Sequence, residues 1–150
     1  MERLAKVDIG PVWARFNEEL IRLVDYVPED KINWSPRAEL WNFRGILLHI
    51  AATRDSWLEH AVKDGESVDS VWTTVRTRDE IKEAYQRTWL RVERFLANEP
   101  ALDAMYDDED GPVSGHWIAF HLLEHDIHHR GDIFHYLALL GIETPDVGTP

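Results

Sequence analysis

The apolar, histidine-rich stretch from Ser114 to Leu140 limits the folds open to this chain more than any other segment. Its apolar residues recur every three or four positions, which is the period of an α-helix. Gly141 is placed to end that helix, and Pro145 follows shortly after. We therefore predict a helix from Ser114 to Leu140 that is buried or half-buried along much of its length.

Four of the eight histidines fall within residues 121–132, namely His121, His125, His128 and His129. His121, His125 and His129 follow one another at intervals of four residues. At about 100° per residue they lie one turn apart on one helix face, where two imidazoles can bind one divalent ion. A helix can also carry histidines as hydrogen-bonded core residues or on a solvated face. The concentration of four in one apolar helix favours metal binding.

Three further segments show helical spacing of apolar residues. They run from about Asp8 to Tyr26, Ala38 to Val62 and Thr77 to Ala97. Asp8 is a candidate N-cap, and Thr77 and Glu80 have the spacing of a capping box. Together with the C-terminal helix, these segments predict an all-α chain, and the short connectors between them favour a four-helix bundle.

The connectors are polar or contain helix-breaking residues. Two prolines interrupt helical continuity between Val27 and Pro36, and we expect Trp34 in this segment to pack back on the helices. The polar segment 63–70 is predicted to be a loop. The acidic segment 101–111 is predicted to be a short loop or a strand-like excursion.

Composition excludes several classes of protein. The chain has 150 residues and no cysteine, so we predict one domain over residues 1–150 with no disulfide, thiolate metal site or cysteine nucleophile. The net charge of −12 opposes nucleic-acid binding, because phosphate contacts need clustered Lys and Arg. No apolar stretch approaches the ~18 residues of a membrane-spanning helix, and no signal-peptide pattern is visible. We expect a cytoplasmic protein with neither membrane nor nucleic acid as a partner.

A metal held by two histidines of one helix needs a third ligand from elsewhere. His49 is the best candidate by elimination, because it lies in the middle of another predicted helix with apolar residues on both sides. His60 lies near a helix end among charged residues and is expected to be solvated. Three imidazoles suit Zn²⁺, Ni²⁺, Fe²⁺ or Mn²⁺ and leave a position for water, as in catalytic sites. Three carboxylates are near enough in sequence to accept hydrogen bonds from the imidazole N–H groups: Glu124, Asp126 and Asp132.

The C-terminal helix has a second apolar strip besides its core face. The strip consists of Phe120, Leu123, Ile127, Phe134 and Ala138. One face can fill the bundle core, and the other needs a cover. A homodimer formed through this helix is the simplest cover, and a long loop folded over the strip is the alternative.

Two motifs resemble the DinB-like (DinB/YfiT) superfamily of metal-dependent enzymes. One is Leu47-Leu-His49-Ile-Ala51, and the other is His125-Asp-Ile-His-His129-Arg-Gly-Asp132-Ile, followed by Gly141 and Pro145-Asp146. The resemblance implies a four-helix bundle with an up-down-down-up course and frequent homodimers. It also implies a divalent metal, often nickel or zinc, held by three histidines. Matching the motifs assigns these ligands to His49, His125 and His129.

This chain departs from the family pattern at several positions. Asp132 stands where the family usually has Gln, and His121 and His128 are additional histidines. These three are candidates for acid–base roles, and the two histidines could also compete as ligands. We expect Arg130 to pair with a carboxylate across the bundle. The resemblance implies thiol-dependent transferases and isomerases that use mycothiol, bacillithiol or glutathione, with the metal lowering the pKa of the thiol.

Two functions from different classes follow. The first is a metal-dependent enzyme, either a thiol S-transferase or a hydrolase that uses metal-activated water on a small-molecule substrate. The second is a non-catalytic dimeric helical bundle that binds a small molecule or a metal. A metal without exchangeable water would favour the second. Helix position places Glu18, Glu19 and Arg54 near the mouth of the expected site.

Overall fold

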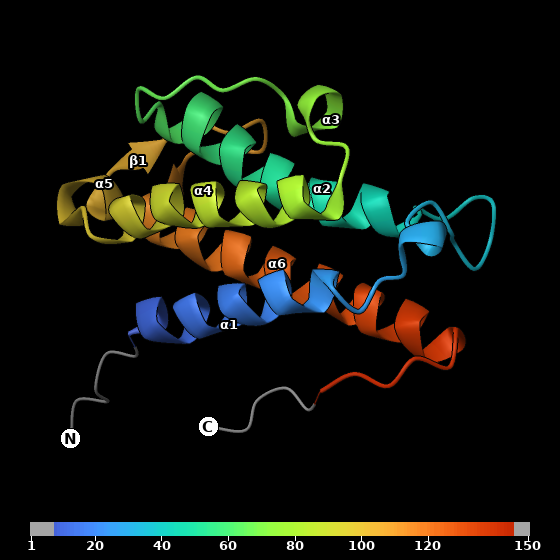
Figure 1. The fold of residues 1–150 in the computed structure, drawn as a ribbon. Helices are drawn as coiled ribbons and strands as arrows, with labels where there is room; N and C mark the ends of the chain where they lie inside the picture. The colour runs from blue at the N-terminus through green and yellow to red at the C-terminus, as the bar shows by residue number, and fades with distance from the viewer. Residues whose placement is uncertain (1–7, 146–150) are drawn as a thin grey trace.

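Four long helices dominate the computed structural model, which describes residues 8–145 (Figure 1). They are α1 (Ile9–Val24), α2 (Phe43–Ser56), α4 (Arg78–Leu96) and α6 (Gly115–Leu139). In Figure 1, α1 and α6 run in one direction, and α2 and α4 run in the other. This confirms the predicted all-α four-helix bundle and its up-down-down-up course. The predicted single domain also includes residues 1–7 and 146–150, which lie outside the described part, as does Asp146 of the second motif.

Several short elements complete the fold. They are η1, a 3₁₀ turn (Glu29–Lys31), η2, a π-helical turn (Trp57–Val62), α3 (Val71–Thr74), α5 (Glu99–Asp103), β1 (Met105–Tyr106) and β2 (Val113–Ser114). The two strands pair antiparallel, with Met105 opposite Ser114. The acidic segment 101–111 therefore contains the end of α5 and the strand β1, and its remaining residues form a loop that leads to β2. Elements this short show no helical period, which explains why the sequence did not predict α3 and α5.

The predicted helix ends agree with the structure at most positions. The side chain of Asp8 caps α1 by accepting a hydrogen bond from Gly10 N, and Thr77 and Glu80 form the predicted capping box of α4. Gly141, with φ 72°, ends α6, and the amide of the next residue donates to Leu137 O. This is the Schellman arrangement, in which the positive φ favours glycine.

Helix α2 begins later than predicted. The expected start at Ala38 is wrong, because the side chain of Asn42 accepts a hydrogen bond from Gly45 N at 2.7 Å and caps a helix that begins at Phe43. A side-chain cap satisfies an amide that the first turn leaves unpaired, so it fixes the start. The helix then continues through η2 to the predicted end at Val62.

The bundle core is apolar apart from a few buried polar side chains, which belong to the two networks described below. Trp34 packs back as predicted, with ring centroids 5.9 Å from Phe43 and 5.8 Å from Tyr136. Fully buried side chains from all four long helices fill the centre, including Trp13, Leu20, Phe43, Leu47, Tyr85, Ile118 and Leu122. Across residues 8–145, no helix combines the length and the apolar character needed to span a bilayer.

Gly115→Ala is expected to lower the free energy of unfolding by about 1–3 kcal/mol, the usual cost of forcing extra volume into a packed site. A Cβ at Gly115 would lie 2.2 Å from the carbonyl oxygen of Ala101 and 2.7 Å from Cα of Leu102, both backbone atoms of α5. Urea unfolding measures the change. Gly131→Ala in the same helix is the control, because a Cβ there meets nothing within 4 Å. An equal effect of the two substitutions would contradict the packing.

The second apolar strip of α6 is partly open. Phe120 is 60% exposed and Ile127 is 46% exposed, whereas Leu123 and Phe134 are half-buried. No loop within residues 8–145 covers Phe120 or Ile127.

We propose that a second copy of the chain covers this strip. Light scattering of the wild type is expected to give twice the 17.5 kDa of one chain, and the double substitution Phe120→Ser with Ile127→Ser should give one. A monomeric wild type would contradict the proposal.

Candidate metal centre

Three histidines from two helices meet at one side of the bundle. His49 projects from α2, and His125 and His129 project from α6. One ring nitrogen from each lies within 4.8 Å of the others, and the ring centroids are 4.5 to 4.8 Å apart. These three residues, here called the histidine triad, are the set that the sequence analysis selected. The structure therefore brings the predicted ligands together.

Local sequence explains why the three side chains converge. Leu47, Leu48 and Ile50 are fully buried and anchor α2, so His49 between them emerges half-buried at the edge of the core. On α6, His125 and His129 are one turn apart and therefore share a face. Because α2 and α6 pack side by side, the two faces meet.

The closest contact in the triad is between Nε2 of His49 and Nε2 of His125, which are 2.8 Å apart. Thr53, one turn after His49 on α2, places its hydroxyl 3.4 Å from Nε2 of His125 and 3.5 Å from Nδ1 of His49. Sequence reasoning did not select Thr53. Its position one turn from His49 was the available signal.

Burial favours the uncharged form of two members of the triad, His49 and His129. Burial, together with the neighbouring His125 and His129, lowers the pKa of His49 to about 4. Burial also lowers the pKa of His129, against the opposing effect of its hydrogen bond to Asp132. Neutral imidazoles offer lone pairs to a metal, and their burial carries no charge penalty. The donor set, three nitrogens without thiolate or carboxylate, therefore fits a divalent transition metal such as Zn²⁺ or Ni²⁺.

Asp132 orients one member of the triad. Nδ1–H of His129 donates to Oδ2 of Asp132 at 3.0 Å, which leaves Nε2 of His129 as the nitrogen with a free lone pair. His128 is exposed and packs edge-on against His129, with ring centroids 4.9 Å apart. His128, His129 and Asp132 also form a second, overlapping group of possible ligands.

Asp126 and Arg54 occupy positions that the sequence analysis did not anticipate. Arg54 was expected near the mouth of the site, but both side chains are fully buried. The carboxylate accepts hydrogen bonds from Arg54 Nε at 2.9 Å, Arg54 Nη2 at 2.7 Å and Trp13 Nε1 at 3.0 Å. Arg54 Nη1 donates to Asn17 and Thr88. One polar network therefore joins all four long helices directly behind the triad.

This network approaches the triad without a hydrogen bond to it. Oδ1 of Asp126 and Nδ1 of His125 lie 3.9 Å apart, and both are buried without a hydrogen-bond partner within residues 8–145. The predicted role of Asp126 as a hydrogen-bond acceptor for an imidazole is therefore not realised at this distance. Glu124, the third predicted acceptor, is exposed.

The remaining predicted residues lie around the triad or away from it. Arg130 pairs with Glu19 at 2.9 Å, as expected for a pair across the bundle, and covers the ring of Phe16. His121 stacks on Trp117 with centroids 4.8 Å apart, outside the triad. Glu18 and His60 are exposed.

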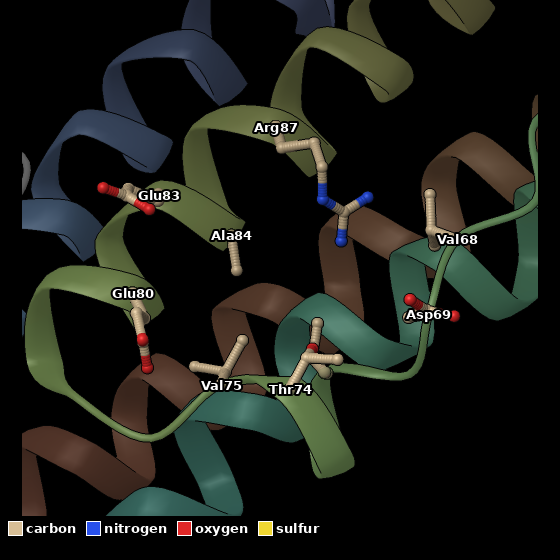
Figure 2. Close-up of a pocket in the computed structure, with 9 residues that line it drawn as sticks. Val68, Asp69, Thr74, Val75, Glu80, Glu83, Ala84 and Arg87 are labelled. Carbon is tan, nitrogen blue, oxygen red and sulfur yellow. The ribbon is translucent and has the colours of Figure 1, made fainter.

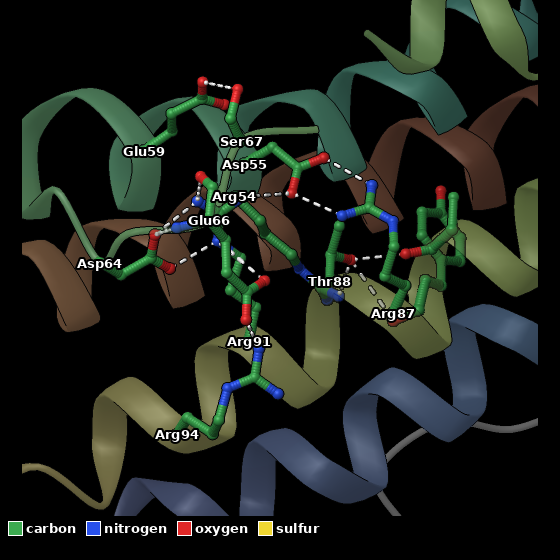
Figure 3. A network of polar contacts seen from close by, with 12 residues as sticks. Arg54, Asp55, Glu59, Asp64, Glu66, Ser67, Arg87, Thr88, Arg91 and Arg94 are labelled. Carbon is green, nitrogen blue, oxygen red and sulfur yellow. Dashed lines mark hydrogen bonds and ion pairs between the residues drawn. The ribbon is translucent and has the colours of Figure 1, made fainter. Parts of the chain in front are cut away.

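A second polar network fixes the segment between η2 and α3 (Figure 3). Arg91 of α4 is 1% exposed on its side chain and donates to Asp64 at 2.6 Å and to Asp55 at 3.1 Å. Arg87 binds the same Asp55. These contacts tie the polar loop 63–70 to α2 and α4, so its position over the bundle is set by buried charge pairs.

A separate hollow of about 530 Å³ lies between α3 and α4 (Figure 2). Its lining includes Asp69, Glu80 and Glu83, and none of the triad histidines. Because no triad histidine lines it, this hollow is distinct from the histidine site. Glu80 is already engaged in the capping box of α4.

The fold and the triad define a helical-bundle protein with a candidate metal site of three imidazoles. A family model for the DinB superfamily matches residues 13–133, and the chain belongs to that superfamily. This confirms the resemblance seen in the two motifs. Among curated proteins, the chain has no significant match.

Solved structures with the same fold come from several bacteria. A DinB-like protein from Bacillus cereus is 17% identical with a TM-score of 0.77, and the match covers 92% of this chain and 94% of that one. A DinB-like protein from Bacillus subtilis is 19% identical with a TM-score of 0.73, covering 92% and 95%. A candidate DinB family member from Exiguobacterium sibiricum is 14% identical with a TM-score of 0.72, covering 94% and 97%. At these identities the likeness establishes the fold.

Proposed function

We propose that the protein is a metal-dependent enzyme whose divalent metal, nickel or zinc in the first place and iron or manganese otherwise, is held by His49, His125 and His129. The observation that carries the proposal is the convergence of three imidazoles with no fourth His, Asp or Glu in the group, within residues 8–145. Three protein ligands leave a coordination position open, which is typical of catalytic rather than structural sites.

The reaction we propose is transfer of a low-molecular-weight thiol to an electrophilic small molecule, or hydrolysis by water. A divalent metal at the triad would lower the pKa of a thiol or water in the open position. The chain's own residues orient the site: Asp132 fixes the ring of His129, and the hydroxyl of Thr53 faces His49 and His125. A cytoplasmic location would supply such thiols in reduced form.

Proton transfer is assigned to the two additional histidines. Asp132 is engaged with His129 and Asp126 with Arg54. The side chains of His121 and His128 make no hydrogen bond to other parts of residues 8–145, and the ring of His128 lies 4.9 Å from that of His129. We propose that His121 or His128 accepts the proton released by the thiol or water.

The engagement of both nearby carboxylates, Asp126 and Asp132, favours the second candidate, a non-catalytic bundle that binds a metal or a small molecule. Neither Asp126 nor Asp132 is free to act as a general base, because each is held by a cationic or imidazole partner. Under this alternative the triad would capture a ligand without turnover.

Assays of metal-free, zinc-loaded and nickel-loaded protein separate the two candidates. With glutathione, bacillithiol or mycothiol and 1-chloro-2,4-dinitrobenzene, an S-transferase forms a sulfur–carbon bond, releases chloride and passes the thiol proton to a base. With 4-nitrophenyl acetate and no thiol, a hydrolase releases nitrophenolate. We expect one of these rates to require the metal and to vanish in His49→Ala. Rates independent of the metal and of His49 would overturn the enzyme proposal, and a metal without exchangeable water would support the binding protein.

A further inference from the structure

Two partly exposed tryptophans lie near the histidine triad, and one of them contacts it directly. The ring of Trp41 packs edge-on to His49, with centroids 4.5 Å apart, and lies nearly parallel to that of His129 at 6.4 Å. Trp72 packs edge-on to Trp41 at 6.0 Å. Trp41 is 47% exposed and Trp72 is 40% exposed. We call these two residues the tryptophan pair.

The tryptophan pair is assembled from segments far apart in sequence. Trp41 precedes the N-cap of α2, and its carbonyl oxygen accepts a hydrogen bond from the Tyr136 hydroxyl of α6 at 2.9 Å. Trp72 sits on α3, which packs beside α2. Both tryptophans are therefore fixed by surrounding structure, although the core buries only part of either ring.

The tryptophan pair lines a hollow of about 360 Å³. The other lining residues are Leu40, Asn42 and Gly45, and Leu40 is itself 45% exposed. Three large apolar side chains thus gather at one open site. An apolar patch beside the polar imidazoles of the triad is characteristic of ligand sites, which combine apolar walls with a few polar groups.

The lining also limits the charge of the ligand. None of its residues carries a charge, so a charged group in the hollow would have no counter-charge there and would lose hydration. Two tryptophan rings at a steep angle offer faces and edges to a flat apolar group. The preferred occupant is therefore neutral, planar and apolar.

We propose that this hollow binds a neutral aromatic portion of the substrate, while the polar reacting end of the same molecule reaches the histidine triad. The inference rests on the proposed metal site and narrows its substrate class. Trp41 lines the hollow and also packs against His49 and His129, so the hollow borders the triad.

A second aromatic group near the triad serves as the comparison. Trp57, Trp117 and His121 pack on one another, and Trp117 stacks flat on His121 with an interplanar angle of 6°. One face of Trp117 is therefore already occupied. Trp117 is 42% exposed, almost the same as Trp72, so it is a matched control of the same residue type.

Two metal-binding probes test the proposal on zinc-loaded protein by titration calorimetry. Benzohydroxamate and acetohydroxamate share the metal-binding group and differ in the phenyl ring. The wild type is expected to bind benzohydroxamate about tenfold more tightly, since stacking and burial of one ring contribute at least this factor. Trp72→Ala should bring the ratio close to one and leave acetohydroxamate binding unchanged, because Trp72 has no ring contact with the triad in the structure. Trp117→Ala should keep the wild-type ratio.

The outcomes separate this inference from the proposed function. Equal binding of both probes to the wild type would overturn the aromatic site and leave the metal site standing. No zinc-dependent binding of either probe would overturn both. Loss of the preference in Trp117→Ala but not in Trp72→Ala would place the ring at the other aromatic group and contradict the assignment. Equal zinc content and circular dichroism of the variants exclude misfolding as the cause.

Discussion

Asp126→Ala is expected to lower the free energy of unfolding by about 3–5 kcal/mol, because it leaves the Arg54 guanidinium buried without its counter-charge. Both side chains are fully inaccessible to solvent. Three hydrogen bonds converge on one carboxylate oxygen, from Arg54 and from Trp13 Nε1. Removing the acceptor therefore disrupts contacts to α1 and α2 together.

Urea unfolding followed by circular dichroism measures this loss. Asp25→Ala is the control, since Asp25 binds Lys82 in a solvent-accessible pair and should contribute little to stability. Replacing both partners by apolar residues, Arg54→Met with Asp126→Leu, should restore part of the stability. A stability of Asp126→Ala within about 1 kcal/mol of the wild type would contradict a buried, paired charge.

Asp132→Ala is expected to weaken zinc binding by about 10–100-fold, the usual effect of removing a hydrogen-bond partner of a metal-binding histidine. The carboxylate accepts the Nδ1–H of His129 at 3.0 Å, which leaves the lone pair of Nε2 available to a metal. Asp132→Asn should lose less, because the amide oxygen can still accept that hydrogen bond.

Competition with a chromophoric chelator measures the zinc affinity of each variant. Glu124→Ala is the control, because Glu124 is an exposed carboxylate on the same helix whose side chain makes no hydrogen bond to the triad within residues 8–145. Equal affinities of Asp132→Ala and Glu124→Ala would show that Asp132 does not act on the metal site.

The histidine triad could be predicted from sequence because its geometry is mostly local. His125 and His129 share a face through their spacing alone, which holds in any α-helix. His49 was selected from its apolar neighbours Leu48 and Ile50, and both are buried. The family motifs pointed to the same three residues.

The polar network behind the triad was missed because its partners are distant in sequence. Arg54 and Asp126 are 72 residues apart, and a charged residue on a helix is usually solvated. A signal was nevertheless present. Arg54 lies four residues before the buried Leu58, and Asp126 lies four after the buried Leu122, so each continues a core-facing row.

The tryptophan pair could not have been predicted from helical periodicity. Trp41 lies in a segment that was assigned to α2, and the Asn42 cap places it outside that helix. Trp72 is on α3, a helix of four residues, too short to show a period. Their meeting depends on the path of the loop, which Arg91 and Asp64 help to fix.

Metal content of the untagged protein, purified without a nickel column, tests the central claim most directly. Mass spectrometry is expected to find about one equivalent of Zn²⁺, Ni²⁺, Fe²⁺ or Mn²⁺ per chain in the wild type, and none in a folded His125→Ala variant. Absence of metal from the wild type, with none taken up on titration, would contradict the metal centre. An unchanged metal content in His125→Ala would contradict the assignment of its ligands.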